Sequence, residues 1–429
     1  MSTEKLLKKI SKNVGIIFFG NTSASVLNFI SFTIMANQLG PSLLAVLVLA
    51  QTYALIANDI FNIQTWESMV KFGAVGTRSD KLINTIKTNV LLDAFSAVGA
   101  FSFALLLVKP VSSILGWDHA NSHIISLYSV YIVFNLTSLT IGIPRLFDKF
   151  MAIAKIQVVV AAIKLVSVLL VMMFTGSLHF YFYIFICADI LTNLLLIVFS
   201  FMLLKTELGA NWWKGPVKFS KEHLRFIWWT NLRTIIRIPV RHFDMIVVSS
   251  AMSMHSVGIY KVYKEIAGII SRVGEPVNQA VFPEFSKLID SGELNRAGSI
   301  TKRTMLFLSG VSVAITLICL FSSRFLIGTF YGVEYLTDIM VLYLLQILFG
   351  VSFVLVPINS LFLAAGFAKY SFYLVLFTNS AYLVTAFYLG TVIGLYGVII
   401  AYAVQMFLNQ GLKIYFLNKY SDNWGEIAR

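Results

Sequence analysis

Hydrophobic residues recur in long runs along the whole chain, and short polar segments separate the runs. A membrane-spanning helix needs about 20 mostly apolar residues, a length that most of these runs reach. Strands that cross a membrane are shorter and alternate between apolar and polar residues, a period that the runs lack. The pattern therefore predicts an all-α polytopic membrane protein of about twelve transmembrane helices. We place them at residues 14–36, 42–63, 83–108, 120–143, 151–175, 178–204, 224–251, 257–282, 303–321, 336–365, 370–389 and 394–417.

The two halves of the chain form an internal repeat. LGPSLLAVL at 39–47 aligns with MSMHSVGIY at 252–260, and the same offset lays Ala45 on Gly258 and Pro144 on Pro357. At the first of these pairs, close helix packing favours a small residue. Each half has an even number of spans, so both enter the membrane in the same orientation, as in transporters built from parallel repeats. We therefore expect two parallel six-helix repeats, an N-lobe and a C-lobe, around a central cavity.

Lysine and arginine placement predicts the orientation. These residues gather in alternate segments, including the N-terminal tail and the linker at 205–223, whereas the opposite segments hold only Lys109 and Arg324. Because such residues favour the cytoplasmic side, both termini and the linker are predicted to be cytoplasmic. The net charge of +13 is mostly this signal and requires no nucleic-acid partner. The predicted domains are a tail at 1–13, the N-lobe at 14–204, the linker at 205–223, the C-lobe at 224–417 and a tail at 418–429.

Composition agrees with a membrane protein. The chain is 58% hydrophobic and 12% charged, against about 45–50% and about 25% in an average soluble domain. Its two cysteines, Cys187 and Cys319, each lie within an apolar run. We expect both to be small buried core residues, with no disulfide framework, metal site or cofactor.

The predicted span at 224–251 carries an unusual row of charges. In NLRTIIRIPVRHFDMIVV (231–248), Arg233, Arg237, Arg241 and Asp244 fall within about 80° of one another around a helix. Arg237 and Arg241 lie about 20 Å and about 25 Å from the cytoplasmic end, too deep to extend to the membrane surface. A charge facing lipid there costs at least about 2.5–3.5 kcal/mol. We therefore expect this face to line a polar interior.

The next span adds a second charged face. If the two spans are antiparallel with a short connection, Arg241 comes near Glu265, Arg233 near Glu275, and Asp244 near Lys261 and Lys264. Cations outnumber anions on the two faces, and a purely structural network would more naturally balance. The surplus predicts an anionic ligand such as a phosphate or diphosphate, with a structural network as the alternative. The cations are Arg233, Arg237, Arg241, Lys261, Lys264 and Arg272, and the anions are Asp244, Glu265 and Glu275.

The N-terminal half is polar but has no basic stripe. Asp59 lies near two asparagines in the second span, Lys164 lies in the fifth span and Asp189 in the sixth. Asp59 and Asp189 are candidates for ion coupling. A satisfied buried carboxylate is the alternative for Asp59.

Three segments resemble O-antigen flippases of the Wzx type, which share a superfamily with the multidrug and toxic-compound extruders. They are IPRLFDKFMAIAKIQVVVAAIKL (143–165), SVGIYKVYKEIAGII (256–270) and PVNQAVFPEFSKL (276–288). The resemblance implies transfer of an undecaprenyl-diphosphate-linked oligosaccharide from the inner to the outer leaflet of the bacterial cytoplasmic membrane. It implies alternating access coupled to a proton or sodium gradient, a cationic cavity, contact with membrane lipid, and a polysaccharide polymerase and chain-length regulator as partners. O-antigen and capsule both remain open as the product.

Other functions fit the sequence less well. A drug extruder of the same fold usually carries cations and needs carboxylates in its path, and a lipid II flippase normally has two further spans. A membrane-bound polymerase or glycosyltransferase usually presents catalytic residues on a sizeable loop, whereas the external segments here have the length of plain connections. The chain contains no GxxxxGK[ST] motif for ATP. We therefore predict a transporter and not an enzyme.

Overall fold

The computed structural model describes residues 3–63, 65–73, 80–115, 117, 122–174, 179–272, 281, 285, 288–289, 291 and 293–419. Within these ranges, the side chains of residues 3–21, 233, 236–237, 239–241, 271–272, 294 and 368 lie outside the description. The chain divides into two compact units. Unit 1 comprises Met1–Leu39 and Val46–Ile238, and unit 2 comprises Gly40–Ala45 and Pro239–Arg429.

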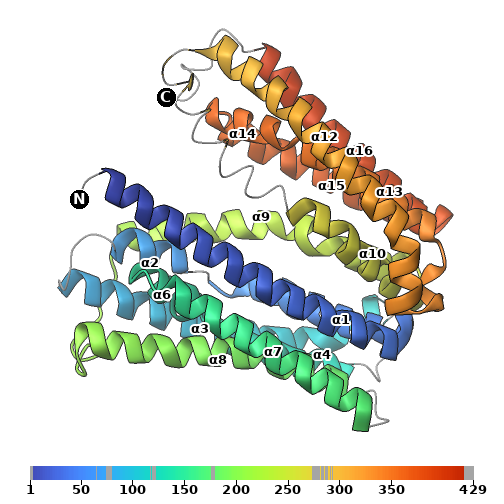
Figure 1. Ribbon diagram of the computed structural model, residues 1–429. Coiled ribbons are helices and arrows are strands. Elements are labelled where there is room, and N and C mark those ends of the chain that lie inside the picture. The colour runs from blue at the N-terminus through green and yellow to red at the C-terminus, as the bar shows by residue number, and fades with distance from the viewer. Residues whose placement is uncertain are drawn as a thin grey trace. The chain divides into compact units, whose positions relative to one another are not determined.

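Unit 1 is a bundle of helices, in which α7 and α8 pack side by side (Figure 1). Helix α1 is bent at Gly40, whose φ of 66° and ψ of 171° are not helical, and Pro41 follows it. The elements are α1 (Thr3–Phe61), α2 (Trp66–Gly73), α3 (Asp80–Ile114), α4 (Ser122–Ser129), α5 (Tyr131–Phe134), η2 (Ser138–Gly142), α6 (Ile143–Leu146), α7 (Phe150–Phe174), α8 (His179–Leu208) and the first part of α9 (Lys221–Ala251).

Unit 2 is a second helical bundle, in which α15 and α16 pack along each other and α13 contacts both α10 and α12. Residues 40–45 of α1 belong to it, as does the second part of α9. Its other elements are α10 (Met254–Arg272), α12 (Leu294–Leu326), η3 (Ile327–Tyr331), η4 (Val333–Leu336), α13 (Ile339–Val354), α14 (Val356–Ala364), α15 (Ala368–Ile393) and α16 (Leu395–Lys419).

The described residues confirm an all-α polytopic protein. Eight helices are long and apolar enough to cross a membrane, and α4–α6 together make a ninth, bent by 53°. Helix α1 contains two predicted spans on either side of its bend. Helices α9 and α10 match two more predicted spans, but their charged residues make them less apolar than the other spans. The described part of the chain is thus consistent with about twelve crossings.

Two broken helices occupy corresponding places in the internal repeat. Pro144 lies in the first turn of α6, directly after the π-helical element η2, and Pro357 lies in the first turn of α14, directly after α13 ends. Proline lacks an N–H group, which the first turn of a helix does not need. The predicted alignment of Pro144 with Pro357 therefore corresponds to a shared local structure, although the sequence predicted each span as one unbroken helix.

Buried hydrogen bonds satisfy the backbone at the breaks of unit 1. Asp93, fully buried on α3, accepts hydrogen bonds from the Thr65 hydroxyl at 2.7 Å and the Ser138 N–H at 2.5 Å. Asn62 donates to the Asn135 carbonyl at 2.9 Å. Backbone groups inside a membrane must find partners within the protein. The carboxylate of Asp93 thus joins the end of α1 to the break between α5 and η2.

We expect Asp93→Ala to lower the stability of unit 1 by about 2–6 kcal/mol, because two buried donors would lose their acceptor at about 1–3 kcal/mol each. The measurement is the apparent Tm of the purified full-length protein in detergent. Asp80→Ala is the matched control, since Asp80 lies on the same helix but is exposed. Equal Tm values for the two variants would contradict a structural role for Asp93.

The linker between α8 and α9 is fixed to α3. The Asn84 side chain donates to the Lys218 carbonyl and accepts from the Lys218 N–H, both at 2.7 Å. Lys87 Nζ donates to the Lys214 carbonyl. At the start of α9, His223 Nε2 lies 2.8 Å from the Ser68 hydroxyl, and burial lowers the pKa of its imidazole. The linker is therefore an ordered part of unit 1.

The cysteine prediction was wrong for one of the two residues. Cys187 is exposed on α8, and Cys319 is partly buried. Bundle surfaces in this protein are themselves apolar, with exposed phenylalanine and leucine on most helices. A position within an apolar run therefore does not distinguish the core from a surface that faces lipid.

Candidate functional site: a polar cavity in unit 1 and a charged pair in unit 2

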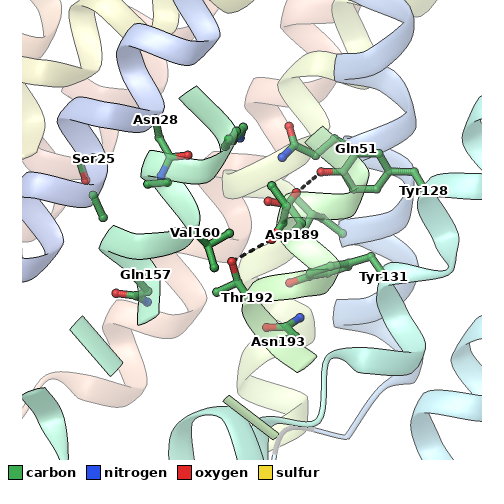
Figure 2. Close-up of a pocket in the computed structure, with 15 residues that line it drawn as sticks. Ser25, Asn28, Gln51, Tyr128, Tyr131, Gln157, Val160, Asp189, Thr192 and Asn193 are labelled. Atoms are coloured by element: carbon green, nitrogen blue, oxygen red, sulfur yellow. Dashed lines mark hydrogen bonds between the residues drawn. The ribbon is translucent and has the colours of Figure 1, made fainter. Parts of the chain in front are cut away.

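A polar cavity of about 510 Å³ lies within unit 1. Five stretches of helix contribute to it, namely the two arms of α1, the α4–α5 segment, α7 and α8 (Figure 2). On α7, Gln157 and Lys164 lie two turns apart on the same face, and on α8, Asp189 and Asn193 lie one turn apart. This volume falls in the range of about 300–1,000 Å³ that is typical of ligand sites.

Asp189 forms the charged centre of this cavity. Its carboxylate accepts a hydrogen bond from the Tyr128 hydroxyl, and Gln51 lies beside the same tyrosine (Figure 2). Lys164 is close enough to interact electrostatically with Asp189, and its Nζ lies 3.5 Å from the centre of the Phe185 ring. Asp59 is not among the described residues that line the cavity, and its carboxylate accepts a hydrogen bond at 3.3 Å from Asn58.

Four amide side chains contribute to the rest of the lining. Asn28, Gln51, Gln157 and Asn193 all face the cavity. The Asn193 amide nitrogen is buried and has no hydrogen-bond partner in the described structure. Buried amides are nearly always hydrogen-bonded, so this cavity offers a donor to a ligand that carries acceptors.

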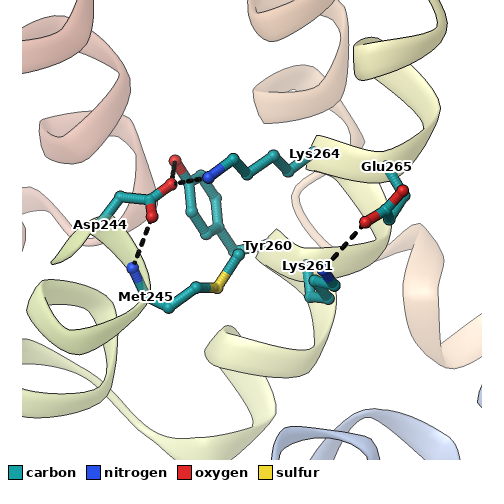
Figure 3. Close-up of polar contacts among 6 residues, drawn as sticks. All are labelled: Asp244, Met245, Tyr260, Lys261, Lys264 and Glu265. Atoms are coloured by element: carbon teal, nitrogen blue, oxygen red, sulfur yellow. Dashed lines mark hydrogen bonds and ion pairs between the residues drawn. The ribbon is translucent and has the colours of Figure 1, made fainter. Parts of the chain in front are cut away.

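The predicted pairing of α9 with α10 is confirmed at one position. Lys264 forms an ion pair with Asp244, which also accepts hydrogen bonds from the Tyr260 hydroxyl at 3.3 Å and the Met245 N–H at 2.9 Å (Figure 3). Asp244 is 6% exposed. A buried carboxylate with this set of donors is a fixed structural element of unit 2.

Lys261, which was predicted to lie near Asp244, forms its ion pair with a different residue. Lys261 Nζ lies 2.9 Å from Glu265, one turn further along α10 (Figure 3). The i,i+4 spacing brings these two side chains together on the helix itself. Pairing residues of two antiparallel helices by their sequence numbers predicts their depth in the membrane. It does not predict the direction in which each side chain points around its helix, and this is why Lys261 pairs with Glu265.

The other predicted cations lie where only the backbone is described. The backbones of Arg233, Arg237 and Arg241 are helical within α9, and that of Arg272 is helical at the end of α10. Their side chains, and the whole of Glu275, lie outside the described residues. Most of the PVNQAVFPEFSKL segment lies outside them as well.

Sequence reasoning missed most of the cavity in unit 1. It singled out Lys164 and Asp189, which do line one site, but not their neighbours Tyr128, Gln51 and Asn193. A signal existed, since Gln157 and Lys164 on one helix, like Asp189 and Asn193 on the next, repeat at helical spacing within apolar runs.

Comparison with known proteins identifies the family. A profile of the family described as polysaccharide biosynthesis protein matches residues 74–341, more than half of the chain. The chain belongs to the polysaccharide biosynthesis protein family. A curated relative, inner membrane protein YghQ of Escherichia coli (strain K12), is 22% identical over 336 residues, which cover 77% of this chain and 94% of that protein.

Solved structures show the fold of this polysaccharide biosynthesis protein. An inward-facing multidrug resistance MATE family transporter of the MOP superfamily matches with a TM-score of 0.75 and 15% identity, over 94% of this chain and 96% of that one. Lipid II flippase MurJ, in an inward closed conformation, matches with a TM-score of 0.70 and 15% identity, over 96% and 89%. The predicted architecture of two helical lobes is therefore confirmed. The predicted domain boundaries stay a prediction.

Proposed function

We propose that this polysaccharide biosynthesis protein transfers a lipid-linked oligosaccharide, with undecaprenyl diphosphate as the carrier, from the inner to the outer leaflet of the bacterial inner membrane. The family match and the fold shared with lipid II flippase MurJ support a transporter of lipid-linked substrates. The similarity to inner membrane protein YghQ supports the location. Alternating access would carry the substrate across, with membrane lipid around its polyprenyl tail.

The observation that carries this proposal is the amide-rich lining of the cavity in unit 1. A sugar presents many hydroxyl groups, each of which both donates and accepts hydrogen bonds, and amides match both roles. An apolar drug would leave these amides unpartnered, at about 1–3 kcal/mol each. A cationic drug would meet Lys164 as well as Asp189. The lining therefore favours an oligosaccharide over the substrates of a drug extruder.

We assign the diphosphate to the cations of α9 and α10. Arg233, Arg237 and Arg241 recur on one helix face, and Lys261, Lys264 and Arg272 follow on the next helix. Asp244 and Glu265 neutralise Lys264 and Lys261, so we expect the surplus positive charge to lie on the arginines. Arginine suits this role because its planar group can hold two phosphate oxygens at once.

The deciding experiment is deletion of the gene in its own host. We expect lipid-linked repeat units to accumulate in the inner leaflet and the corresponding surface polysaccharide, O-antigen or capsule, to disappear. Expression of the wild-type chain should restore the polymer, which controls for effects on neighbouring genes. Normal surface polymer in the deletion strain, with no second flippase present, would exclude the proposed function.

Asp189 is our candidate for coupling to a proton or sodium gradient, because it is the carboxylate within the cavity. We expect Asp189→Asn to fold normally, since the amide oxygen can still accept from Tyr128, but to lower transport by about 5- to 150-fold, the range of typical coupling energies. Asp338→Asn is the control, since Asp338 is exposed. The double variant Asp189→Asn, Lys164→Met tests whether the loss of transport in Asp189→Asn is caused only by the positive charge left on Lys164. Unchanged transport and gradient dependence in Asp189→Asn would assign it a structural role.

We also propose that both termini and the linker are cytoplasmic. In a chain with Cys187→Ser and Cys319→Ser, a cysteine at Ser253, exposed between α9 and α10, should react with a membrane-impermeant maleimide added to intact cells. A cysteine at Asn211, exposed in the linker, should react only after the cells are broken. Labelling of Asn211→Cys in intact cells would reverse the topology.

A further inference from the structure

A second, smaller cavity lies wholly within unit 2. It has a volume of about 210 Å³ and lies where α9, α10, α13, α15 and α16 converge. One water molecule occupies about 30 Å³ in the liquid, so the cavity has room for about seven waters or one ring-sized group. Its lining is of three kinds, namely aromatic walls, a pair of amides and one pair of opposite charges.

Aromatic rings form the walls of this cavity. The Tyr402 ring lies between two others, with its centre 5.8 Å from Phe349 and 6.4 Å from Tyr382, and both pairs meet nearly edge to face, at 75° and 77°. Such rings combine flat apolar faces with a hydroxyl at one end. The axial C–H groups of a sugar ring form a flat apolar patch that packs on a face of this kind.

The amides supply an unused donor. Gln405 donates through Nε2 to the Asn379 carbonyl oxygen at 2.9 Å, which fixes the orientation of the Asn379 side chain. Asn379 is 4% exposed, and its Nδ2 has no hydrogen-bond partner among the described residues. Because buried donors are nearly always satisfied, a ligand atom that accepts a hydrogen bond would complete this group.

The charges in the lining cancel. Asp244 and Lys264 form an ion pair, and they are the charged residues among those described around the cavity. A diphosphate would have to displace Asp244 from Lys264, and a cation would have to displace Lys264 from Asp244. The site is therefore suited to a neutral ligand that has ring faces and hydroxyl groups.

We propose that this cavity binds one neutral sugar ring, and that it reads part of the oligosaccharide while the arginines of α9 hold the diphosphate. The proposal rests on the proposed function for the source of the sugar. The preference for a neutral sugar ring rests on Tyr402, Asn379 and the Asp244–Lys264 ion pair. Asn379 Nδ2 donates to a sugar hydroxyl, and the face of Tyr402 packs on the ring.

The test uses purified full-length protein in detergent and saturation-transfer NMR with methyl glycosides of glucose, galactose, mannose and N-acetylglucosamine. We expect at least one of these sugars to bind. Asn379→Leu and Tyr402→Ala should each weaken that binding at least about tenfold, whereas Tyr402→Phe should retain it. Asn409→Leu is the matched control, because Asn409 is a buried amide on α16 outside the cavity, bonded to Thr378 at 3.1 Å.

Two results would overturn this assignment. One is that none of the four glycosides binds, and the other is that Asn379→Leu, with an unchanged Tm, binds them as well as the wild type. Binding of inorganic diphosphate, followed by ³¹P NMR, should be unaffected by Asn379→Leu. If sugar binding fails while gene deletion still abolishes the surface polymer, the cavity assignment is wrong and the proposed function stands. If deletion leaves the polymer intact, the proposed function is wrong.

Discussion

The double variant Arg237→Ala, Arg241→Ala is expected to lower transport of the lipid-linked oligosaccharide at least about 100-fold. Each arginine is expected to make charge-assisted hydrogen bonds to the diphosphate, which contribute about 1.5–3 kcal/mol each. Losing two such contacts gives a total of about 3–6 kcal/mol, and every 1.4 kcal/mol is tenfold. The measurement is transfer of lipid-linked sugar in proteoliposomes, normalised to the amount of folded protein.

Two comparisons separate binding from stability. The double Lys variant of Arg237 and Arg241 keeps the charges and loses the planar fork, so it should retain part of the activity. Arg225→Ala should retain all of it, since Arg225 is exposed at the cytoplasmic end of the same helix. Glu265 keeps Lys261 as a partner, at 2.9 Å, when Arg241 is removed. Wild-type transport by the alanine double variant would show that these arginines do not hold the substrate.

Gly258→Ala is expected to destabilise unit 2 by about 3 kcal/mol or more, at the upper end of what overpacking costs. A Cβ atom at this position of α10 would lie 2.0 Å from the Pro41 carbonyl oxygen and 2.6 Å from its carbonyl carbon. Both are backbone atoms, so relief requires moving the bend of α1 and not merely turning a side chain. The apparent Tm in detergent should fall by about 6–12 °C, at about 2–4 °C per kcal/mol for a unit of this size.

Gly268→Ala provides the control for this substitution. Gly268 lies on the same helix, and a Cβ atom there would meet no atom within 4 Å. Alanine should therefore be neutral or slightly stabilising, because it favours a helix by about 1 kcal/mol over glycine. If both variants melted at the same temperature, the close approach of α10 to Pro41 would not exist in the folded protein.

Much of the fold follows from the sequence because lipid imposes a simple rule. Every crossing needs an apolar run of a certain length, so the spans could be located. The repeat then identified Gly258 as a position for a small residue, and the short distance to Pro41 confirms that prediction. The breaks before Pro144 and Pro357 were not predicted, because the hydrophobic pattern continues through them. Side chains such as Asp93 satisfy the backbone there, and their contacts come from other helices.

The candidate site was predictable only in part. Lys164, Asp189 and Asp244 could be picked out from the sequence because they are charged residues within apolar runs. Burying a charge in a membrane costs free energy, so such residues usually have a structural or functional role. Neutral amides such as Gln51 and Asn379 cost less to bury and stand out less from the apolar residues around them. Their role depends on which hydrogen bonds they make or leave unmade, and the hydrogen-bonding partners come from distant parts of the chain. Asn379 attracts attention only because its Nδ2 has none among the described residues.

The membership of residues 40–45 in unit 2 has a consequence for biosynthesis. The ribosome makes this segment before most of unit 1, whereas Gly258, which packs against Pro41, emerges much later. Unit 2 can therefore complete its packing only around a segment that was synthesised much earlier than the rest of the unit. If the gene were divided within the linker at 205–223, the second fragment would lack that piece and would leave the surface at Gly258 uncovered. We therefore expect the later half of this protein to fold correctly only when the earliest helix is present.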